Sequence, residues 1–297
     1  MIRYQITSNN PTSHYFDVTI QIDKPDQKSQ RLRLPNWIPG SYMIRDFSRN
    51  IIELSARSNV GDLQITQQDK SNWTIEGATE ALTIKYKVYA KDLSVRGAHL
   101  DHSHGYYNGS SVFLEVVGQS DSPCEVEITK PAGAQYQNWQ VASSLPFKGK
   151  SRFEFGLFEA QDYDDLIDHP VEMGEFGCIS FEACGVPHDF ILTGRYQCDE
   201  ARLKQDLVKI CEHHIRFFGE PAPMDYYQFQ VIVVGGGYGG LEHRASTSLM
   251  CSRDSLPLPG QVEMNDKYRD FLGLCSHEYF HTWNIKRIKP AVYQPYD

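Results

Sequence analysis

The stretch His277-Glu278-Tyr279-Phe280-His281 decides how the end of this chain folds and what it could bind. On a helix, positions four residues apart lie on one face about one turn from each other, so both imidazoles can reach one metal ion. Glu278 follows the first histidine and is placed to take a proton from a water molecule on that metal. Because a buried helix needs partners for its polar groups, the motif predicts a zinc site with His277 and His281 as ligands.

The residues before the motif predict the helix that carries it. Asn265 or Asp266 offers an N-cap, and apolar and aromatic side chains occur on several faces, which predicts a buried helix. Gly273 lies one turn before His277 and would leave room beside that ligand. The competing interpretation is that a motif with only three fixed positions arises by chance.

Length and composition limit the possible classes of protein. With 297 residues the chain is long enough for two domains, and 40% hydrophobic residues indicate a folded globule rather than disorder. The formal net charge is −9 and no long Lys/Arg run occurs, which counts against nucleic acid and anionic membranes as partners.

The N-terminus and the cysteines predict a cytoplasmic protein. The chain opens with strand-like sequence instead of a basic segment and an apolar one, so we expect no signal peptide. No stretch reaches the length of about 18 apolar residues that predicts a membrane span. The 7 cysteines are odd in number and lack C-x-x-C pairing, which favours reduced thiols.

The first half of the chain has the pattern of β-strands. Apolar and polar side chains alternate over residues 16–23, 82–88 and 125–129, with turn residues between them. Short strands at this spacing predict an all-β sandwich over residues 1–165. A change in composition near residue 165 places a second domain at 166–297.

Two segments of this half could carry function. Leu34–Tyr42 holds a tryptophan between two prolines, which predicts an ordered loop, either a packed corner or a wall that faces substrate. His99–His104 holds three histidines and an aspartate. On an extended strand His102 and His104 would share a face and His99 would point away, so we expect no functional metal there.

The second half begins with a strand at 179–183 and a helix. Asp199 is its expected N-cap, and Gly219 and Pro221 are expected to stop it. Its expected apolar stripe consists of Leu203, Leu207, Ile210, His214 and Phe217.

A glycine-rich segment follows the predicted strand Tyr227–Val234. Residues 235–240 satisfy G-x-G-x-x-G, the dinucleotide fingerprint, but that site needs a helix at the glycines, and Arg244–Ser248 has the pattern of a second strand instead. We therefore favour a glycine-rich turn that leads into an edge strand, where a peptide can pair with the backbone. Glu242 would then offer a carboxylate to an ammonium group, unless it is an ordinary solvated strand residue.

Four motifs, in order along the chain, resemble the M61 family of glycyl-aminopeptidase-like zinc peptidases. They are Pro35–Tyr42, Asp168–Gly174, Tyr238–His243 and His277–Asn284. The resemblance implies an α+β multidomain protein, with an N-terminal all-β sandwich followed by the N-terminal part of a thermolysin-like (gluzincin) catalytic domain.

The resemblance also implies roles for particular residues. Gly239-Gly240-Leu241-Glu242-His243 stands where the related M1 aminopeptidases carry G-A-M-E-N. Glu242 would bind the free α-amine of the substrate, and the backbone of Gly239 and Gly240 would hold the first peptide unit. This chain has His243 where the wider pattern has asparagine, which leaves the details of amine recognition open.

The end of the chain departs from the gluzincin pattern. Only 16 residues follow His281 (297 − 281) and none is a glutamate, so the expected third zinc ligand is not among them. We therefore expect the catalytic domain to be truncated in this chain, without its C-terminal remainder and a PDZ-like domain, and the fragment itself to be inactive.

The resulting expectation is a zinc-dependent aminopeptidase that favours N-terminal glycine or alanine on peptides with a free N-terminus, with Glu278 as general base. A catalytically inactive peptide-binding module of the same fold is the alternative, and a nucleotide-binding protein is a more distant one.

Overall fold

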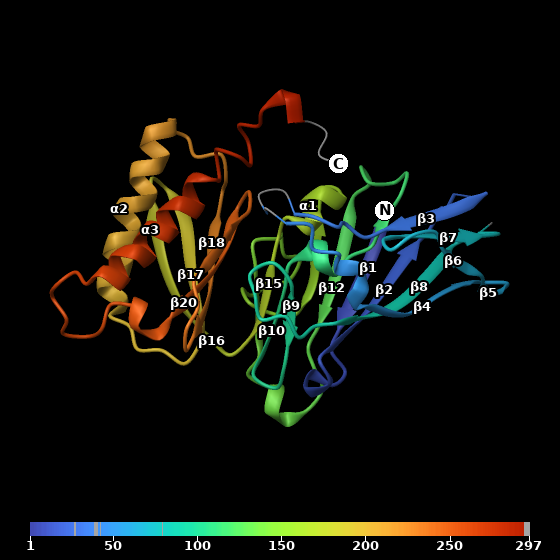
Figure 1. Ribbon diagram of the computed structural model, residues 1–297, viewed down its shortest axis with the longest axis horizontal. Helices are drawn as coiled ribbons and strands as arrows, with labels where there is room; N and C mark the ends of the chain where they lie inside the picture. The colour runs from blue at the N-terminus through green and yellow to red at the C-terminus, as the bar shows by residue number, and fades with distance from the viewer. Residues whose placement is uncertain (27, 39–40, 42, 79, 294–297) are drawn as a thin grey trace. The chain divides into compact units, whose positions relative to one another are not determined.

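The computed structural model describes residues 1–26, 28–38, 41, 43–78 and 80–293 (Figure 1). Contacts between Cα atoms divide the chain into two compact units, Met1–Glu175 and Phe176–Asp297. The boundary predicted near residue 165, within about ten residues, precedes this division, and residues 166–175 belong to the first unit. The reason is strand pairing, because β15 (Val171–Gly174) lies between β10 (His104–Tyr107) and β13 (Gln140–Ser143) in one sheet.

The described part of the first unit consists mainly of β-sheets. Its 7-stranded sheet is mostly antiparallel, with β1 and β12 as a parallel pair. In spatial order its strands are β14 (Gly156–Ala160), β12 (Cys124–Thr129), β1 (Ile2–Thr7), β2 (Tyr15–Ile22), β8 (Leu82–Tyr89), β4 (Ile51–Ser58) and β5 (Gly61–Leu63).

Two 4-stranded sheets accompany it, the one that contains β15 and a second one. The strands of the first are β13, β15, β10 and β9 (Ala98–Leu100), and those of the second are β11 (Glu115–Val116), β3 (Ser29–Arg33), β7 (Asn72–Glu76) and β6 (Ile65–Gln67). A short helix, α1 (Tyr163–Ile167), begins at its N-cap Asp162.

The core of this unit lies between sheets. Phe16 of β2 packs edge-on against Tyr107 of β10, with ring centroids 5.6 Å apart, and Phe113 contacts both Tyr107 and Tyr4. Each such pair contributes roughly 0.5–1.5 kcal/mol beyond the burial of its area. These rings join the 7-stranded sheet to the sheet of β10, so the predicted β-sandwich is confirmed.

The predicted strands of this unit are also confirmed. In β2, β8 and β12 every second side chain is buried, as the alternating sequence requires. In the predicted loop, the indole nitrogen of Trp37 donates to the carbonyl of Ser41 at 2.6 Å. Pro39, Gly40 and Tyr42 of that segment lie outside the described residues.

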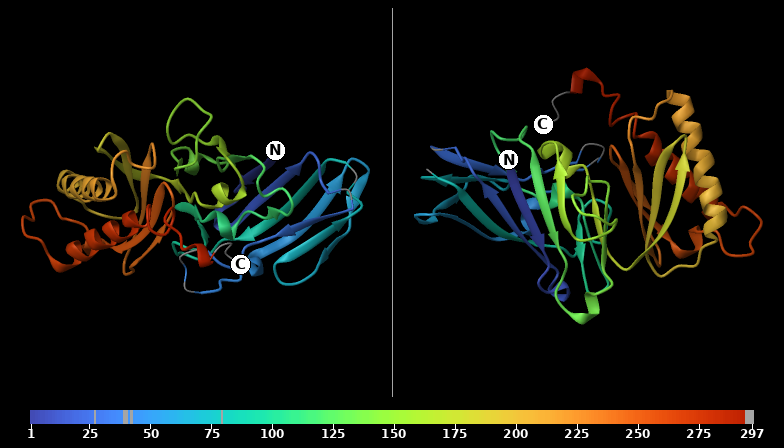
Figure 2. Two further views of the ribbon diagram at one scale, coloured as in Figure 1. Left: turned by 90° about the horizontal axis from the view of Figure 1, so that it is seen from above. Right: turned by 180° about the vertical axis from the view of Figure 1, so that it is seen from behind.

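The second unit holds a 5-stranded sheet with two long helices on one face, as Figures 1 and 2 show. The strand order is β16 (Phe176–Ala183), β17 (Val186–Gly194), β18 (Tyr227–Val234), β20 (Ser246–Ser252) and β19 (Gly239–Glu242). The helices are α2 (Glu200–Phe218), which contacts β16, and α3 (Asp266–Phe280), which contacts β19 and β20. This arrangement places the end of α3 beside the edge strand β19.

The ends of α2 are as predicted, but three of the five residues of its predicted apolar stripe are not buried. Asp199 caps the helix and Gly219 ends it with φ of 101°. The buried residues are Leu203, Leu207, Cys211 and Ile215. The predicted continuation through Ile210, His214 and Phe217 is wrong, because the stripe advances by four residues at each turn and leaves Phe217 70% exposed.

Candidate metal centre

Helix α3 carries the two predicted ligands at its C-terminal end. Asn265 is its N-cap, with its side-chain oxygen accepting from the amide of Tyr268 at 2.8 Å, and Phe280 is its last residue. The helix is not buried on all sides, as its apolar residues had suggested. The sides of Gly273 and His277 are exposed, which leaves His277 open to solvent.

The imidazoles of His277 and His281 converge. Their Nε2 atoms are 3.0 Å apart and the ring planes are nearly perpendicular, at 89°. Nδ1 of His281 lies 2.6 Å from the carbonyl oxygen of Asn284 and donates its hydrogen there, so Nε2 keeps the lone pair that a metal needs. Two ligand nitrogens on a tetrahedral zinc with bonds of about 2.0 Å would be about 3.3 Å apart, close to the separation seen.

Two carboxylates join the histidines. Ligand atoms of Glu242, Glu278 and His281 all lie within 4.8 Å of one another. Glu278 is 5% exposed and Glu242 is 6% exposed, so Glu242 is not the solvated strand residue of the competing interpretation. Imidazole nitrogens with carboxylate oxygens are the donor set that zinc accepts, and these residues fit that ion.

Strand β19 runs tightly against the end of α3. A Cβ atom placed on Gly240 would lie 2.2 Å from Oε1 of Glu278, which is closer than any real contact. Only glycine therefore allows this strand to approach the carboxylate. The predicted substrate-binding residues Gly239, Gly240 and Glu242 thus all lie on the strand beside the two histidines.

The electrostatics of the centre favour a neutral first ligand. His277 is exposed overall, but partial desolvation of its ring and the nearby imidazole of His281 lower its pKa, and Glu242 opposes them only in part. A neutral imidazole is the form that binds a metal.

The glycine-rich segment does not form a dinucleotide site. Residues 239–242 are strand β19, which pairs antiparallel with β20, and no helix opens at the glycines. The fingerprint requires such a helix, because its N-terminus binds the pyrophosphate. In the described residues β19 is the edge of the sheet, as the edge-strand interpretation predicts.

The sequence also matches two family models. One, the peptidase M61 N-terminal domain, matches residues 3–175, which is more than half of the chain. The chain belongs to the M61 peptidase family. The second model, M61 glycyl aminopeptidase, matches residues 270–297, which include the histidine motif. No match was found among curated proteins.

Solved structures agree with the M61 assignment. An aminopeptidase N family protein from Idiomarina loihiensis is 46% identical, with a TM-score of 0.96 over 100% of this chain. The M61 chain spans 50% of the length of that protein. An M1 zinc metallopeptidase from Deinococcus radiodurans has a TM-score of 0.55 at 14% identity, covers 97% of this chain and 64% of its own, and shares the fold. None of the described helices combines the length and apolar composition needed to cross a bilayer.

A buried histidine that the sequence did not single out anchors α3 of this M61 chain to the sheet. His188 of β17 donates through Nδ1 to the carbonyl of Val186 at 2.8 Å, so its Nε2 accepts from the hydroxyl of Tyr279 at 2.9 Å. The imidazole stacks on Phe181 and contacts Tyr227. His188 lies 91 positions before Tyr279 in the sequence, so no local pattern could have identified it as the hydrogen-bond partner of this tyrosine.

This histidine makes the second unit sensitive to acid. Burial, only partly offset by the bond to Val186, lowers the pKa of His188 from 6.5 to about 4. In the unfolded chain this histidine becomes protonated as the pH falls below 6.5, but in the folded chain it stays neutral until about pH 4. The free energy of unfolding therefore decreases as the pH falls from 6.5 to about 4. We expect the free energy of unfolding to fall by about 2 kcal/mol between about pH 7 and pH 4.5 from this group.

Urea unfolding of the wild type and of His188→Gln at the two pH values measures this contribution. The variant should lose about 2 kcal/mol less than the wild type on acidification. His213→Gln, a change at an exposed histidine on α2, serves as the matched control and should behave like the wild type. Equal acid losses in wild type and His188→Gln would contradict the assignment.

Proposed function

We propose that this chain carries the first part of the active site of a zinc-dependent aminopeptidase, which removes small N-terminal residues such as glycine or alanine. One observation supports the proposal above others. The two imidazoles of α3 and the carboxylates of Glu278 and Glu242 meet beside β19, the edge strand of its sheet in the described residues. Membership of the M61 family supports the same class of enzyme.

His277 and His281 would hold the zinc ion through their Nε2 atoms. When bound, zinc supplies Lewis acidity, which lowers the pKa of a bound water and polarises a carbonyl group. The carboxylate of Glu278 takes a proton from the attacking water and delivers it to the nitrogen of the leaving amine. Burial of Glu278 and the contact with Gly240 hold that carboxylate in one place.

Glu242 would select substrates by their N-terminus. Its carboxylate lies at the end of β19 and can form a charge-assisted hydrogen bond with an α-ammonium group. The backbone of Gly239 and Gly240 lies on the sheet edge, where it can pair with the first peptide unit of the substrate. A substrate peptide that extended past this point at its N-terminus would collide with Glu242, so the enzyme would remove one N-terminal residue at a time.

The third zinc ligand is proposed to come from outside this chain. Two histidines hold zinc poorly, since catalytic zinc sites use three protein ligands and a water. The Idiomarina loihiensis relative is twice as long as the matched region, because this chain covers 50% of it. We propose that the remainder of a catalytic domain, with a possible PDZ-like domain, completes the site, and that peptides with a free N-terminus are its substrates.

The direct test is made on the full-length protein. We expect bound zinc by elemental analysis and turnover of alanyl and glycyl fluorogenic amides, both abolished by a chelator and restored by zinc. Peptide binding without zinc and without turnover would instead support the inactive binding module.

Replacing Glu242 by alanine should weaken the use of free N-termini. A hydrogen bond to a charged group contributes about 1.5–3 kcal/mol, so kcat/KM for alanyl substrates should fall about 10–100-fold. N-acetylated forms of the same peptides should be cleaved slowly by the wild type, and Glu242→Ala should leave kcat/KM for them unchanged. Glu263→Ala removes an exposed carboxylate of the same unit and should change neither rate. An equal loss on both kinds of substrate would remove Glu242 from this role.

A further inference from the structure

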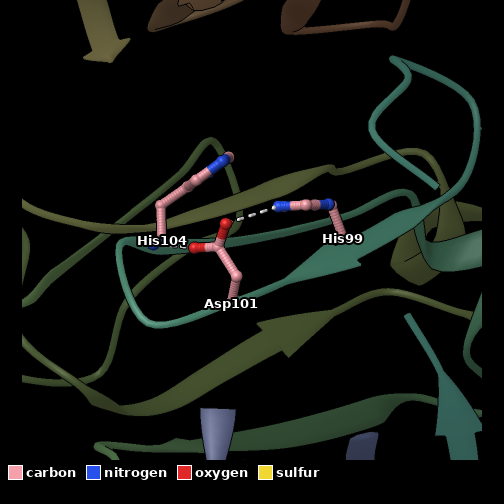
Figure 3. A group of neighbouring side chains, drawn as sticks. All are labelled: His99, Asp101 and His104. Atoms are coloured by element: carbon pink, nitrogen blue, oxygen red, sulfur yellow. Dashed lines mark hydrogen bonds and ion pairs between the residues drawn. The ribbon is translucent and has the colours of Figure 1, made fainter. Parts of the chain in front are cut away.

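A second cluster of residues that could hold a metal ion belongs to the first unit, whereas the proposed zinc site belongs to the second. Figure 3 shows His99, Asp101 and His104 gathered around one point. One ligand atom from each residue lies within 4.8 Å of the others, and both histidines are 8% exposed. The expectation that His99 points away from His104 was wrong. It assumed a continuous strand, whereas the chain turns back between β9 and β10 and brings the two rings to 4.8 Å.

The turn itself aims the carboxylate of Asp101. Oδ1 accepts from the amide and hydroxyl of Ser103 at 2.7 and 2.6 Å and from the amide of His104 at 3.1 Å. Burial would raise the pKa of Asp101, but these hydrogen bonds outweigh it and hold the pKa below its usual value. Oδ2 is left facing Nε2 of His99 at 3.3 Å, the separation of two ligands on a tetrahedral ion.

A buried glutamate orients His104. Nδ1 of His104 lies 3.0 Å from Oε1 of Glu172, which is 1% exposed and belongs to the neighbouring strand β15. If Nδ1 donates its hydrogen to that carboxylate, Nε2 keeps its lone pair. Histidines that bind metals almost always donate the second ring N–H to a carboxylate, a backbone carbonyl or water, and Glu172 supplies the first of these.

We propose that His99, Asp101 and His104 form a binding site for a first-row divalent metal ion, with Glu172 as the residue that positions His104. Two imidazoles and one carboxylate suit Zn²⁺ and its neighbours in the series, with the remaining positions filled by water. The carboxylates of Asp101 and Glu172 would balance the charge of a divalent cation. A site without metal would instead be two separate pairs, His99 with Asp101 and His104 with Glu172.

The experiment uses the whole chain, without an affinity tag that contains histidines. His277→Ala and His281→Ala are introduced together, so that the histidine pair of the second unit no longer contributes to the bound metal. After dialysis against Zn²⁺ and then buffer, elemental analysis should give about one equivalent per chain, and zinc should raise the unfolding temperature. Co²⁺ should bind with a d–d spectrum that reports its coordination.

Three further substitutions test the ligands in that background. Asp101→Asn keeps Oδ1 as an acceptor for Ser103 but replaces Oδ2 by an NH2 group, which has no lone pair for a metal. His99→Phe keeps an aromatic ring beside His104. Both should abolish the bound equivalent and the thermal shift. Glu172→Gln should weaken the affinity about 10–100-fold without abolishing it.

His102→Ala is the matched control, because His102 lies within the same turn but is exposed. It should keep the metal and the thermal shift. The proposal is overturned if the double variant binds no metal, or if Asp101→Asn and His99→Phe bind as tightly as His102→Ala. Since His277 and His281 are absent throughout, neither outcome depends on the proposed peptidase activity.

Discussion

Replacing Glu278 by glutamine in the full-length protein is expected to lower kcat by about 10²–10⁴-fold while zinc stays bound. Glutamine has nearly the same shape as glutamate, so it fills the same buried space between α3 and β19. Its amide cannot accept a proton from water, and that is the step assigned to Glu278. The measurement combines kcat on an alanyl fluorogenic amide with the zinc content of the same preparation.

The two readouts separate the roles that Glu278 could have. Its ligand atom lies within 4.8 Å of those of His281 and Glu242, so coordination of the metal is geometrically possible as well. Loss of zinc together with activity would make Glu278 a ligand, and full activity would place the base elsewhere. Asp270→Asn, at an exposed carboxylate of the same helix, is the matched control and should keep both zinc and activity.

A methyl group on Gly240 is expected to disable the site without touching either histidine. The added Cβ would lie 2.2, 2.4 and 2.6 Å from Oε1, Cδ and Cγ of Glu278. Because Cγ is included, rotation of the carboxylate alone cannot relieve the clash, and either Glu278 or β19 must move. A misplacement of about 1 Å can cost about 10²-fold in rate, so Gly240→Ala should lose at least that much in kcat/KM.

The glycine of α3 provides the control for that substitution. A Cβ on Gly273 would meet nothing within 4 Å, although the residue lies one turn before His277. Gly273→Ala should therefore keep activity and stabilise the protein by roughly 0.5–1 kcal/mol, since alanine is the better helix former. Gly240→Ala added to Glu278→Gln should cost little more than Glu278→Gln alone. Independent, additive losses would show that Gly240 acts on something other than Glu278.

Local sequence patterns predict those features of the site that a single helix provides. The spacing of His277 and His281 on a helix, and the N-cap at Asn265, follow from the period of 3.6 residues, and the structure shows both. The position of Glu242 beside them came from family resemblance, because the approach of β19 to α3 depends on tertiary packing. Catalytic roles for these residues stay predictions, since geometry alone does not measure chemistry.

The two errors concern the regular period of an element, its phase in one case and its end in the other. The stripe of α2 was continued through Ile210 instead of Cys211, a change of one residue in helical phase. At His99–His104 a strand was extended across a turn, which reversed the direction expected for His99. Side-chain hydrogen bonds to the backbone, such as those of Asp101, create such turns and leave little trace in hydrophobic patterns.

His281, the second of the two proposed zinc ligands, is oriented by a main-chain oxygen. His281 follows the last residue of α3, and its ring is oriented by the carbonyl of Asn284 rather than by any side chain. A carbonyl is present whatever amino acid occupies that position, so homologues can vary there freely without disturbing the ligand. Insertions or deletions in the two residues between His281 and Asn284 are a different matter. They would re-aim the imidazole, so we expect the orientation of His281 to depend on the length of this connection more than on its composition.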